Sequence, residues 1–251
     1  MKSIFKIRKY IFFLLRGIFS FIFTEEKCTC CGRKSLFFPL CRKCRENLKQ
    51  EIELNENRCS ICGKILVSEE GKCMACRESA VISSAGRCFP LFSYRLWKKN
   101  LLFEWKLAGK RSLSYVFSDF AYLGLEKMYG RKNIPPVVPV PPRAGKKREK
   151  GWDQIDELCK FLHKNYGVKI LPCLKRLSKN QQKKLNRESR LLTKGHSFAL
   201  KNERISGKKL PREVVLIDDV MTTGVTAESC CSVLKKAGVE KVDVLALFVV
   251  D

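Results

Sequence analysis

Eight of the fourteen cysteines form four C-x-x-C pairs within the first third of the 251-residue chain. Two residues between two cysteines allow one tight turn to direct both thiolates at the same ion, and two such turns complete a tetrahedral site. A site closed by four thiolates is structural, and zinc supplies the folding energy of a segment that has little core of its own. The spacing therefore predicts structural zinc on Cys28, Cys31, Cys41, Cys44, Cys59, Cys62, Cys73 and Cys76.

The pairing of these eight cysteines has two solutions. Two sequential sites, each made of four consecutive ligands, are the simpler arrangement, and an interleaved cross-brace is the alternative. Cys30 lies inside the first turn and competes with Cys31, but Gly32 favours a turn that uses Cys28 and Cys31 because this turn prefers a residue that tolerates positive φ. Metal-bound thiolates belong to a reducing compartment, so we expect a cytoplasmic protein.

A second motif lies at residues 214–229, which read VVLIDDVMTTGVTAES. Four apolar residues bring two aspartates to the carboxyl end of a strand, where the ligands of open α/β sheets bind. A loop that leads into a helix presents backbone N–H groups suited to a phosphate. The two acids can accept hydrogen bonds from ribose hydroxyls or reach magnesium through water. The predicted ribose phosphate site is Asp218, Asp219, Met221, Thr222, Thr223, Gly224, Val225 and Thr226.

A strand, a helix and a strand at residues 213–217, 227–237 and 241–250 must position this loop. Such a βαβ unit is right-handed and builds a parallel sheet, which predicts an α/β fold. Upstream we expect strands at 86–94 and 168–174, an extended run at 136–141, helices at 96–129 and 152–165, and a basic loop at 142–151. The chain thus divides into an N-terminal helix (1–24), a double zinc-ribbon module (25–80) and an α/β domain (81–251).

Fifty Lys and Arg against twenty-five Asp and Glu give a net charge of +25, which favours a polyanionic partner. A lysine-rich solvated surface is the alternative. No run of about 18 uncharged apolar residues occurs, which argues against an ordinary membrane span. The apolar stretch in residues 1–24 is interrupted by Lys and Arg. We expect a helix that packs on the protein, with a basic amphipathic helix on the inner membrane surface as the alternative.

The D-D-x-x-T-T-G-x-T pattern closely resembles the signature with which type I phosphoribosyltransferases bind 5-phosphoribosyl 1-pyrophosphate (PRPP). With the cysteine pairs in front of it, the chain resembles the ComF family, the double-zinc-ribbon phosphoribosyltransferase-like proteins associated with DNA uptake in competent bacteria. Four further segments match in order: FEWKLAGKRSL (103–113), VVPVPPR (137–143), REKGWDQ (148–154) and LSKNQQKKLNRESRLLTKGHSFAL (177–200).

The resemblance implies a type I phosphoribosyltransferase-like parallel sheet with helices on both faces, and PRPP bound with magnesium. Transfer passes through a ribosyl-cation-like state, so the protein must hold and neutralise the departing diphosphate. Lys106, Arg148 and Lys150 are the candidate catalytic residues, and Arg143, Lys146 and Lys147 are further candidates for the charge. Asp153 stands where an Asn is usual in the family, so it adds a negative charge beside the presumed diphosphate site.

Two functions follow. The first is an accessory factor of natural transformation that binds single-stranded DNA, with the PRPP site as a ligand sensor and competence-machinery proteins as partners; the net charge and the basic segment 175–196 favour it. The second is an active phosphoribosyltransferase that acts on an unidentified acceptor, which the complete phosphate loop favours. Fold alone does not separate the two functions.

Overall fold

The computed structural model describes residues 27–35, 38–54, 57–95, 97–143, 145–177, 197–201 and 209–250. The helix expected within residues 1–24, and the basic segment beyond Leu177, lie outside the described residues. None of the helices in the described ranges is both long enough and apolar enough to cross a lipid bilayer.

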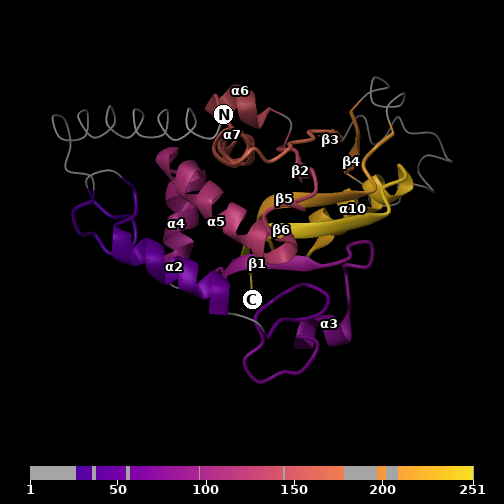
Figure 1. Cartoon of the computed structure of the whole chain (residues 1–251), viewed down its shortest axis with the longest axis horizontal. Coiled ribbons are helices and arrows are strands. Elements are labelled where there is room, and N and C mark those ends of the chain that lie inside the picture. Colours follow the sequence, from indigo (N-terminus) through magenta and orange to yellow (C-terminus); the bar gives the residue numbers. More distant parts are fainter. Residues whose placement is uncertain are drawn as a thin grey trace.

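A four-stranded parallel sheet forms the centre of the protein (Figure 1). Its strands are β1 (Cys88–Ser93), β2 (Val137–Pro139), β5 (Glu213–Met221) and β6 (Lys241–Val249), in the order β1-β6-β5-β2. β5 and β6 are buried along most of their length and read as nearly continuous apolar runs, as expected for parallel strands covered on both faces. The parallel register places the carboxyl ends of all four strands at one edge of the sheet.

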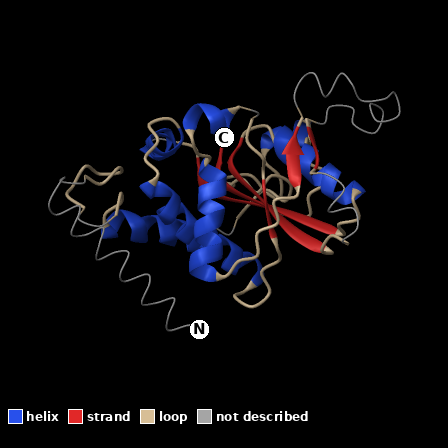
Figure 2. Cartoon of the chain, turned by 90° about the horizontal axis from the view of Figure 1, so that it is seen from above, coloured by secondary structure: helices blue, strands red, loops and turns tan. Residues whose placement is uncertain are grey.

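Helices cover both faces of this sheet, and the strands lie between them in Figure 2. One face packs against α2 (Arg42–Leu54), α4 (Trp97–Lys106), α5 (Ser112–Tyr129) and α7 (Gln154–Tyr166) in a core that includes Trp105, Phe117 and Phe248. The other face packs against α10 (Val225–Lys236) and a two-stranded hairpin, β3 (Leu174–Arg176) and β4 (Phe198–Leu200). The expected α/β class, with a parallel sheet between helices, is confirmed.

Successive side chains of β5 point alternately into the two cores on the opposite faces of the sheet. Val215 and Ile217 face the core beneath α5 and α7, whereas Val214 and Leu216 face α10. Because successive side chains of a strand point to opposite faces, the next two residues, Asp218 and Asp219, also diverge.

Three local expectations need correction. β5 does not end at Ile217 but continues through both aspartates to Met221, because β6 pairs with it as far as Val249. The basic loop at 142–151 contains a short helix, α6 (Lys146–Lys150). Residues 168–174 do not form one strand: Ile170 makes a single parallel bridge to Val137, and β3 begins only at Leu174. Pro172 interrupts this segment and cannot donate to a ladder.

Candidate functional site

The eight cysteines of the C-x-x-C pairs form two sequential clusters rather than a cross-brace. Cys28, Cys31, Cys41 and Cys44 make one cluster, and Cys59, Cys62, Cys73 and Cys76 make the other; within each, all Sγ atoms lie within 4.8 Å of one another. The Sγ atoms of Cys31 and Cys41 are 3.7 Å apart, as are those of Cys62 and Cys73. A tetrahedron with Zn–S bonds of about 2.3 Å has edges of about 3.8 Å, so each cluster can hold a zinc ion.

Tight turns with a glycine of positive φ shape both clusters. Gly32 has a φ of 70° and donates its N–H to the carbonyl of Cys28, while Gly63 has a φ of 72° and donates to the carbonyl of Cys59. Cys30 is not part of the first cluster but packs against the main core. Burial, and next the charge of the Cys28 thiolate, raise the pKa of Cys30 to about 12, so its thiol stays protonated and is a poor metal ligand. All fourteen cysteines are free thiols.

A cleft of about 530 Å³ opens at the carboxyl ends of the four parallel strands. Each strand contributes to its lining: Tyr94 after β1, Val250 after β6, the end of β5, and residues 140–143 after β2. Helix α4 and the start of α7 complete the walls. The volume lies within the range that proteins use for small-molecule ligands.

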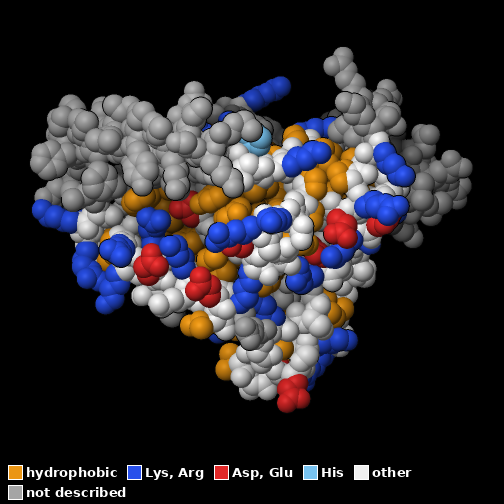
Figure 3. All heavy atoms as spheres, viewed as in Figure 1, with side chains coloured by type: hydrophobic (Ala, Val, Ile, Leu, Met, Phe, Trp, Pro, Cys, Tyr) orange, Lys and Arg blue, Asp and Glu red, His pale blue; other side chains and the backbone are white. Residues whose placement is uncertain are grey.

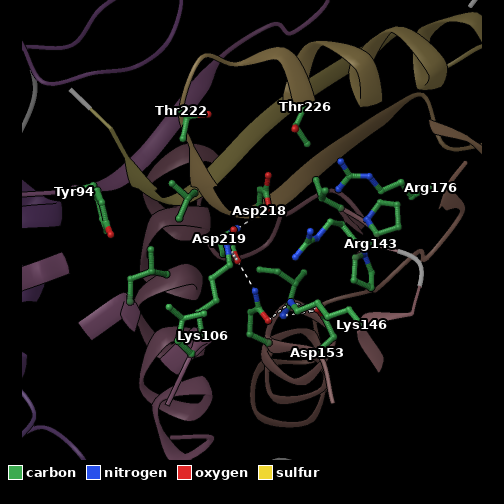
Figure 4. Close-up of a pocket in the computed structure, with 18 of the residues that line it drawn as sticks. Tyr94, Lys106, Arg143, Lys146, Asp153, Arg176, Asp218, Asp219, Thr222 and Thr226 are labelled. Carbon is green, nitrogen blue, oxygen red and sulfur yellow. Dashed lines mark hydrogen bonds and ion pairs between the residues drawn. The ribbon is translucent and has the colours of Figure 1, made fainter. Parts of the chain in front are cut away.

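Asp218 and Asp219 lie in the centre of this cleft and point in different directions (Figure 4). Asp219 faces the helices: its Oδ2 is 2.8 Å from Nζ of Lys106 and accepts a hydrogen bond of 2.5 Å from Nε2 of Gln154. Asp218 faces the loop before α10, where it lines a small adjoining cavity of about 20 Å³ together with Thr222, Gly224 and others. The two acids therefore present oxygens to two parts of one ligand.

Asp218 has an unusual protonation state for a carboxyl group. Its side chain is open to the cleft and enclosed by protein on its other sides, and the backbone N–H of Asp219 donates to its Oδ1 at 2.8 Å. Burial, followed by the negative charge of Asp219, raises the pKa of Asp218 to about 8. A hydrogen-bond donor or a cation bound at this site would favour the ionised form of Asp218.

The loop from Met221 to Thr226 turns β5 into α10. Gly224 is the N-cap of α10 and has a φ of 84°, which a residue with a side chain adopts only with strain. Thr222 and Thr226 line the cleft, Thr223 and Val225 are exposed, and Met221 is buried. The free N–H groups of the first helical turn favour an anion at this end of α10.

Cations gather on one side of the acidic pair. Arg143 follows β2, Lys146 begins α6, and Arg176 ends β3, and all three line the cleft (Figure 4). Asp153 is the N-cap of α7: its Oδ1 accepts from the N–H groups of Ile155 and Asp156, and its Oδ2 lies 2.7 Å from Nζ of Lys146. The added negative charge at position 153 is therefore offset by Lys146 and the helix N-terminus.

The three candidate catalytic residues occupy different places. Lys106 lies in the cleft beside Asp219. Arg148 lines a second cavity of about 290 Å³, which shares Arg143 and Arg176 with the cleft. Lys150 is exposed and donates from Nζ to the carbonyl of Lys106 at 3.2 Å. The structure therefore brings Lys106 together with the acids and the loop, and it does not bring Arg148 or Lys150 into the cleft.

A search against protein-family models finds no match. A curated protein is similar to this chain: the competence protein ComFC of Streptococcus pneumoniae (strain ATCC BAA-255 / R6) is 26% identical over 212 residues, which are 83% of this chain and 86% of that protein. This similarity and the two four-cysteine clusters support the predicted resemblance to the ComF family.

Several residues of this cleft were not among the candidate site residues. Tyr94 directly follows β1 and Arg176 ends β3, and the sequence carries no motif around either residue. Gln154 lies in REKGWDQ, the segment that resembles the ComF pattern, and this was the available signal for it. The side chain of Lys147 lies outside what the structure describes.

Proposed function

We propose that the cleft binds PRPP, or a related ribose 5-phosphate, together with magnesium. The 5-phosphate is held by the loop from Thr222 to Thr226 and by the first turn of α10. Asp218 and Asp219 accept hydrogen bonds from the ribose hydroxyls. Their carboxylates are oxygen donors of the kind that magnesium prefers, so they fit a magnesium–diphosphate ligand directly or through water. The observation that carries this proposal is the convergence of the acidic pair and the threonine–glycine loop in one cleft.

The diphosphate of PRPP belongs on the cationic side of the cleft. Arg143 and Arg176 line that side, and no ion pair joins either of them to another residue in the described ranges. Lys106 is paired with Asp219 in the ligand-free protein. When a ribose hydroxyl takes its place on Asp219, the ammonium group of Lys106 becomes available to the diphosphate, and the magnesium ion would then offset the charge of Asp219.

The proposed biological role is that of an accessory factor in DNA uptake during natural transformation. The similar protein of Streptococcus pneumoniae is named a competence protein, and the net charge of +25 suits a nucleic acid partner. Lys and Arg side chains are spread over the visible face in Figure 3, among fewer Asp and Glu. The second cavity adds Arg148, Lys175 and Lys201 to the two arginines that it shares with the cleft.

DNA and the ribose phosphate occupy different surfaces in this proposal. A nucleotide within DNA lacks the 2′-hydroxyl, and its 3′-oxygen carries the next phosphate. In the cleft, that phosphate would lie beside Asp218 and Asp219, where like charges repel. Single-stranded DNA is therefore assigned to the basic surface around Arg148 and Lys201, outside the acidic pair.

The ligand assignment is tested by the thermal stability of the full chain in the presence of PRPP and magnesium. We expect PRPP to raise the melting temperature, and we expect D218N/D219N to abolish this shift. Glu213→Gln, at the exposed start of the same strand, is the matched control and keeps it. Because the ionised form of Asp218 is the stronger acceptor for a hydroxyl and the better ligand for magnesium, PRPP affinity should rise as the pH increases through about 8. Absence of any shift with PRPP would remove the ligand assignment.

The DNA assignment is tested separately with fluorescent single-stranded DNA. Binding should weaken steeply as salt is added, survive D218N/D219N, and weaken further in R148A/K201A. A complex that is insensitive to salt, or that D218N/D219N removes, would contradict the separation of the two surfaces.

Phosphoribosyl transfer to an acceptor is the second candidate function, and the position of the cationic side favours it. Those cations lie where they would neutralise a diphosphate as it leaves the ribose, which is the main electrostatic task of such a reaction. Release of pyrophosphate from PRPP that depends on Asp218, Asp219 and an added acceptor would support transfer over ligand sensing.

A further inference from the structure

The cleft and the second cavity share part of their lining. Pro141, Pro142, Arg143 and Arg176 line both spaces and so form the boundary between them. Arg143 directly follows the two prolines, whose rings fix the backbone angle φ. The guanidinium of Arg176 lies 5.3 Å from the centre of the buried ring of Phe198. We call Arg143 and Arg176 the shared arginines.

In the ligand-free protein, the cleft depends on the shared arginines to attract an anion. Within the described residues, two other cations line it, and each of them faces an aspartate. Nζ of Lys106 is 2.8 Å from Oδ2 of Asp219. Nζ of Lys146 is 2.7 Å from Oδ2 of Asp153. A diphosphate that enters the cleft therefore meets the shared arginines as its first partners.

The second cavity carries a larger excess of positive charge than the cleft. Besides the shared arginines, Arg148, Lys175 and Lys201 line it, and Asp156 is the one acid among its described lining residues. Such an excess of one sign of charge attracts a polyanion. A DNA strand that follows these cations brings a phosphate to the shared arginines from the side of the second cavity.

We propose that PRPP and single-stranded DNA weaken each other's binding through the shared arginines, so that PRPP is a negative regulator of DNA binding. This inference rests on the proposed function, which assigns the diphosphate to the cleft and DNA to the basic surface of the second cavity. The two ligands occupy different spaces, yet their anionic groups require the same two guanidinium groups.

The sign of this coupling follows from the chemistry of the guanidinium group. Its donors form a rigid fork that binds one phosphate in a bidentate manner, so an arginine engaged by the diphosphate has fewer donors for DNA. Phosphate groups on both sides of the same arginines also repel each other. Both effects disfavour the complex that holds the two ligands at once. By linkage, each ligand must lower the affinity for the other by the same factor.

The test measures the affinity of the full chain for a fluorescent oligothymidine strand at constant ionic strength, with and without saturating PRPP and magnesium. We expect PRPP to weaken DNA binding about tenfold, within the usual range for coupled sites. The matched control is ribose 5-phosphate, which keeps the 5-phosphate and the ribose but lacks the diphosphate, so it should leave the DNA affinity nearly unchanged. Calorimetry should show that bound DNA lowers the PRPP affinity by the same factor.

Three variants locate the coupling. D218N/D219N, which is expected to lose PRPP, should bind DNA equally well with and without it. Arg176→Ala removes one shared guanidinium and should reduce the loss caused by saturating PRPP from about tenfold to a few-fold. Arg212→Ala is the matched control: this side chain is 76% exposed ahead of β5 and lines neither cavity, so the variant should keep the full loss.

Each other outcome overturns a stated part of the proposal. A DNA affinity that PRPP leaves unchanged or increases, in a sample whose melting temperature PRPP raises, would overturn the antagonism and leave both proposed sites intact. An equal loss with ribose 5-phosphate, or a full loss in Arg176→Ala, would overturn the role of the shared arginines. A loss that survives D218N/D219N would mean that PRPP competes directly on the basic surface. If PRPP failed to raise the melting temperature, or DNA failed to bind, the proposed function would fall and this inference with it.

Discussion

The two cysteine clusters have almost the same spacing but are built into the protein differently. The first cluster is continuous with the main core: Cys44 lies in the first turn of α2, and Leu48 and Ile52 of the same helix are fully buried beside α5. Nζ of Lys127 in α5 also donates to the carbonyl of Ile52 at 3.2 Å. Folding of the first cluster is therefore part of the folding of the α/β domain.

The second cluster has a small core of its own and is attached to the edge of the sheet. Cys59, Leu66 and Cys73 form that core. The guanidinium of Arg58 donates to the carbonyl of Pro90 in β1 at 2.7 Å and stacks 4.3 Å from the centre of the Phe89 ring. This cluster is an appended unit, held to β1 by a few specific contacts.

The segment that follows the second cluster continues to the phosphate loop. Ile82 packs so closely on Gly224 that a Cβ at this glycine would lie 2.7 Å from the isoleucine side chain. The carboxylate of Glu228, in the first turn of α10, accepts four hydrogen bonds of 2.6–3.0 Å from the N–H and hydroxyl groups of Ser83 and Ser84. The same four-cysteine motif is thus integrated into the main core in one place and, in the other, is followed by a segment that contacts the proposed ligand site.

The largest effect should follow from breaking the first cluster. C41S/C44S removes two thiolates, so the start of α2 is no longer fixed by the cluster. The buried side chains of α2 then pack less well in the main core. We expect the free energy of unfolding to fall by more than about 4 kcal/mol, because the binding energy of a structural metal is folding energy. Zinc content and urea unfolding measure this. A variant that unfolds at the same urea concentration as the wild type would contradict the integration of this cluster.

Breaking the second cluster should affect the ligand more than the fold. C73S/C76S leaves the cores of the sheet intact but loosens the segment that holds Gly224 and Glu228. We expect a folded α/β domain whose affinity for PRPP is about tenfold lower, an effect of about 1.4 kcal/mol. Circular dichroism reports the fold and calorimetry reports the PRPP affinity of the same sample. An unchanged affinity would show that the second cluster does not influence the proposed ligand site.

The cysteine motif and the acidic loop motif could be recognised in the sequence because each is local. The aspartates lie near the end of one strand and the threonines and glycine of the loop follow it directly, while two neighbouring C-x-x-C pairs make each cluster. The choice between sequential clusters and a cross-brace needed the structure, since spacing permits both. The contact of Ser83 with Glu228 joins residues 145 positions apart and leaves no pattern in either segment.

Other features escaped prediction because tertiary pairing overrides local signals. The acidic pair looks like the end of a strand, yet β6 continues to pair with β5 up to Met221. Helix α2 is strongly charged and its two buried residues are too few to reveal a helix beside four cysteine ligands. Tyr94 and Arg176 enter the cleft only because the fold brings the ends of β1 and β3 to the same edge.

The docking of the second cluster is tested by a matched pair of glycine substitutions. Gly63 and Gly32 have nearly the same positive φ, so alanine introduces similar backbone strain at both. A Cβ at Gly63 would lie 2.1 Å from the carbonyl oxygen of Cys88 in β1, whereas a Cβ at Gly32 meets nothing within 4 Å. We therefore expect Gly63→Ala to cost about 1–3 kcal/mol more than Gly32→Ala in urea unfolding. Equal costs would mean that the second cluster is not seated on β1.

The smallest effect is expected from removing only the contact between Glu228 of α10 and the two serines. Glu228→Gln keeps the size of the side chain but places an amide N–H against serine N–H and hydroxyl donors, so part of the hydrogen bonding is lost. We expect the PRPP affinity to fall a few-fold with nearly unchanged stability, and Glu240→Gln, exposed after the same helix, to change neither.

The hydrogen bonds from Ser83 and Ser84 lower the pKa of Glu228 against the opposing effect of burial. A carboxyl group whose pKa is depressed by folding contributes stability above its unfolded pKa and loses it as the pH falls. The small difference in the free energy of unfolding between the wild type and Glu228→Gln should therefore shrink toward acid pH. If the PRPP affinity fell equally in Glu228→Gln and in Glu240→Gln, the loss would come from the general charge around α10 and not from the contact with the two serines.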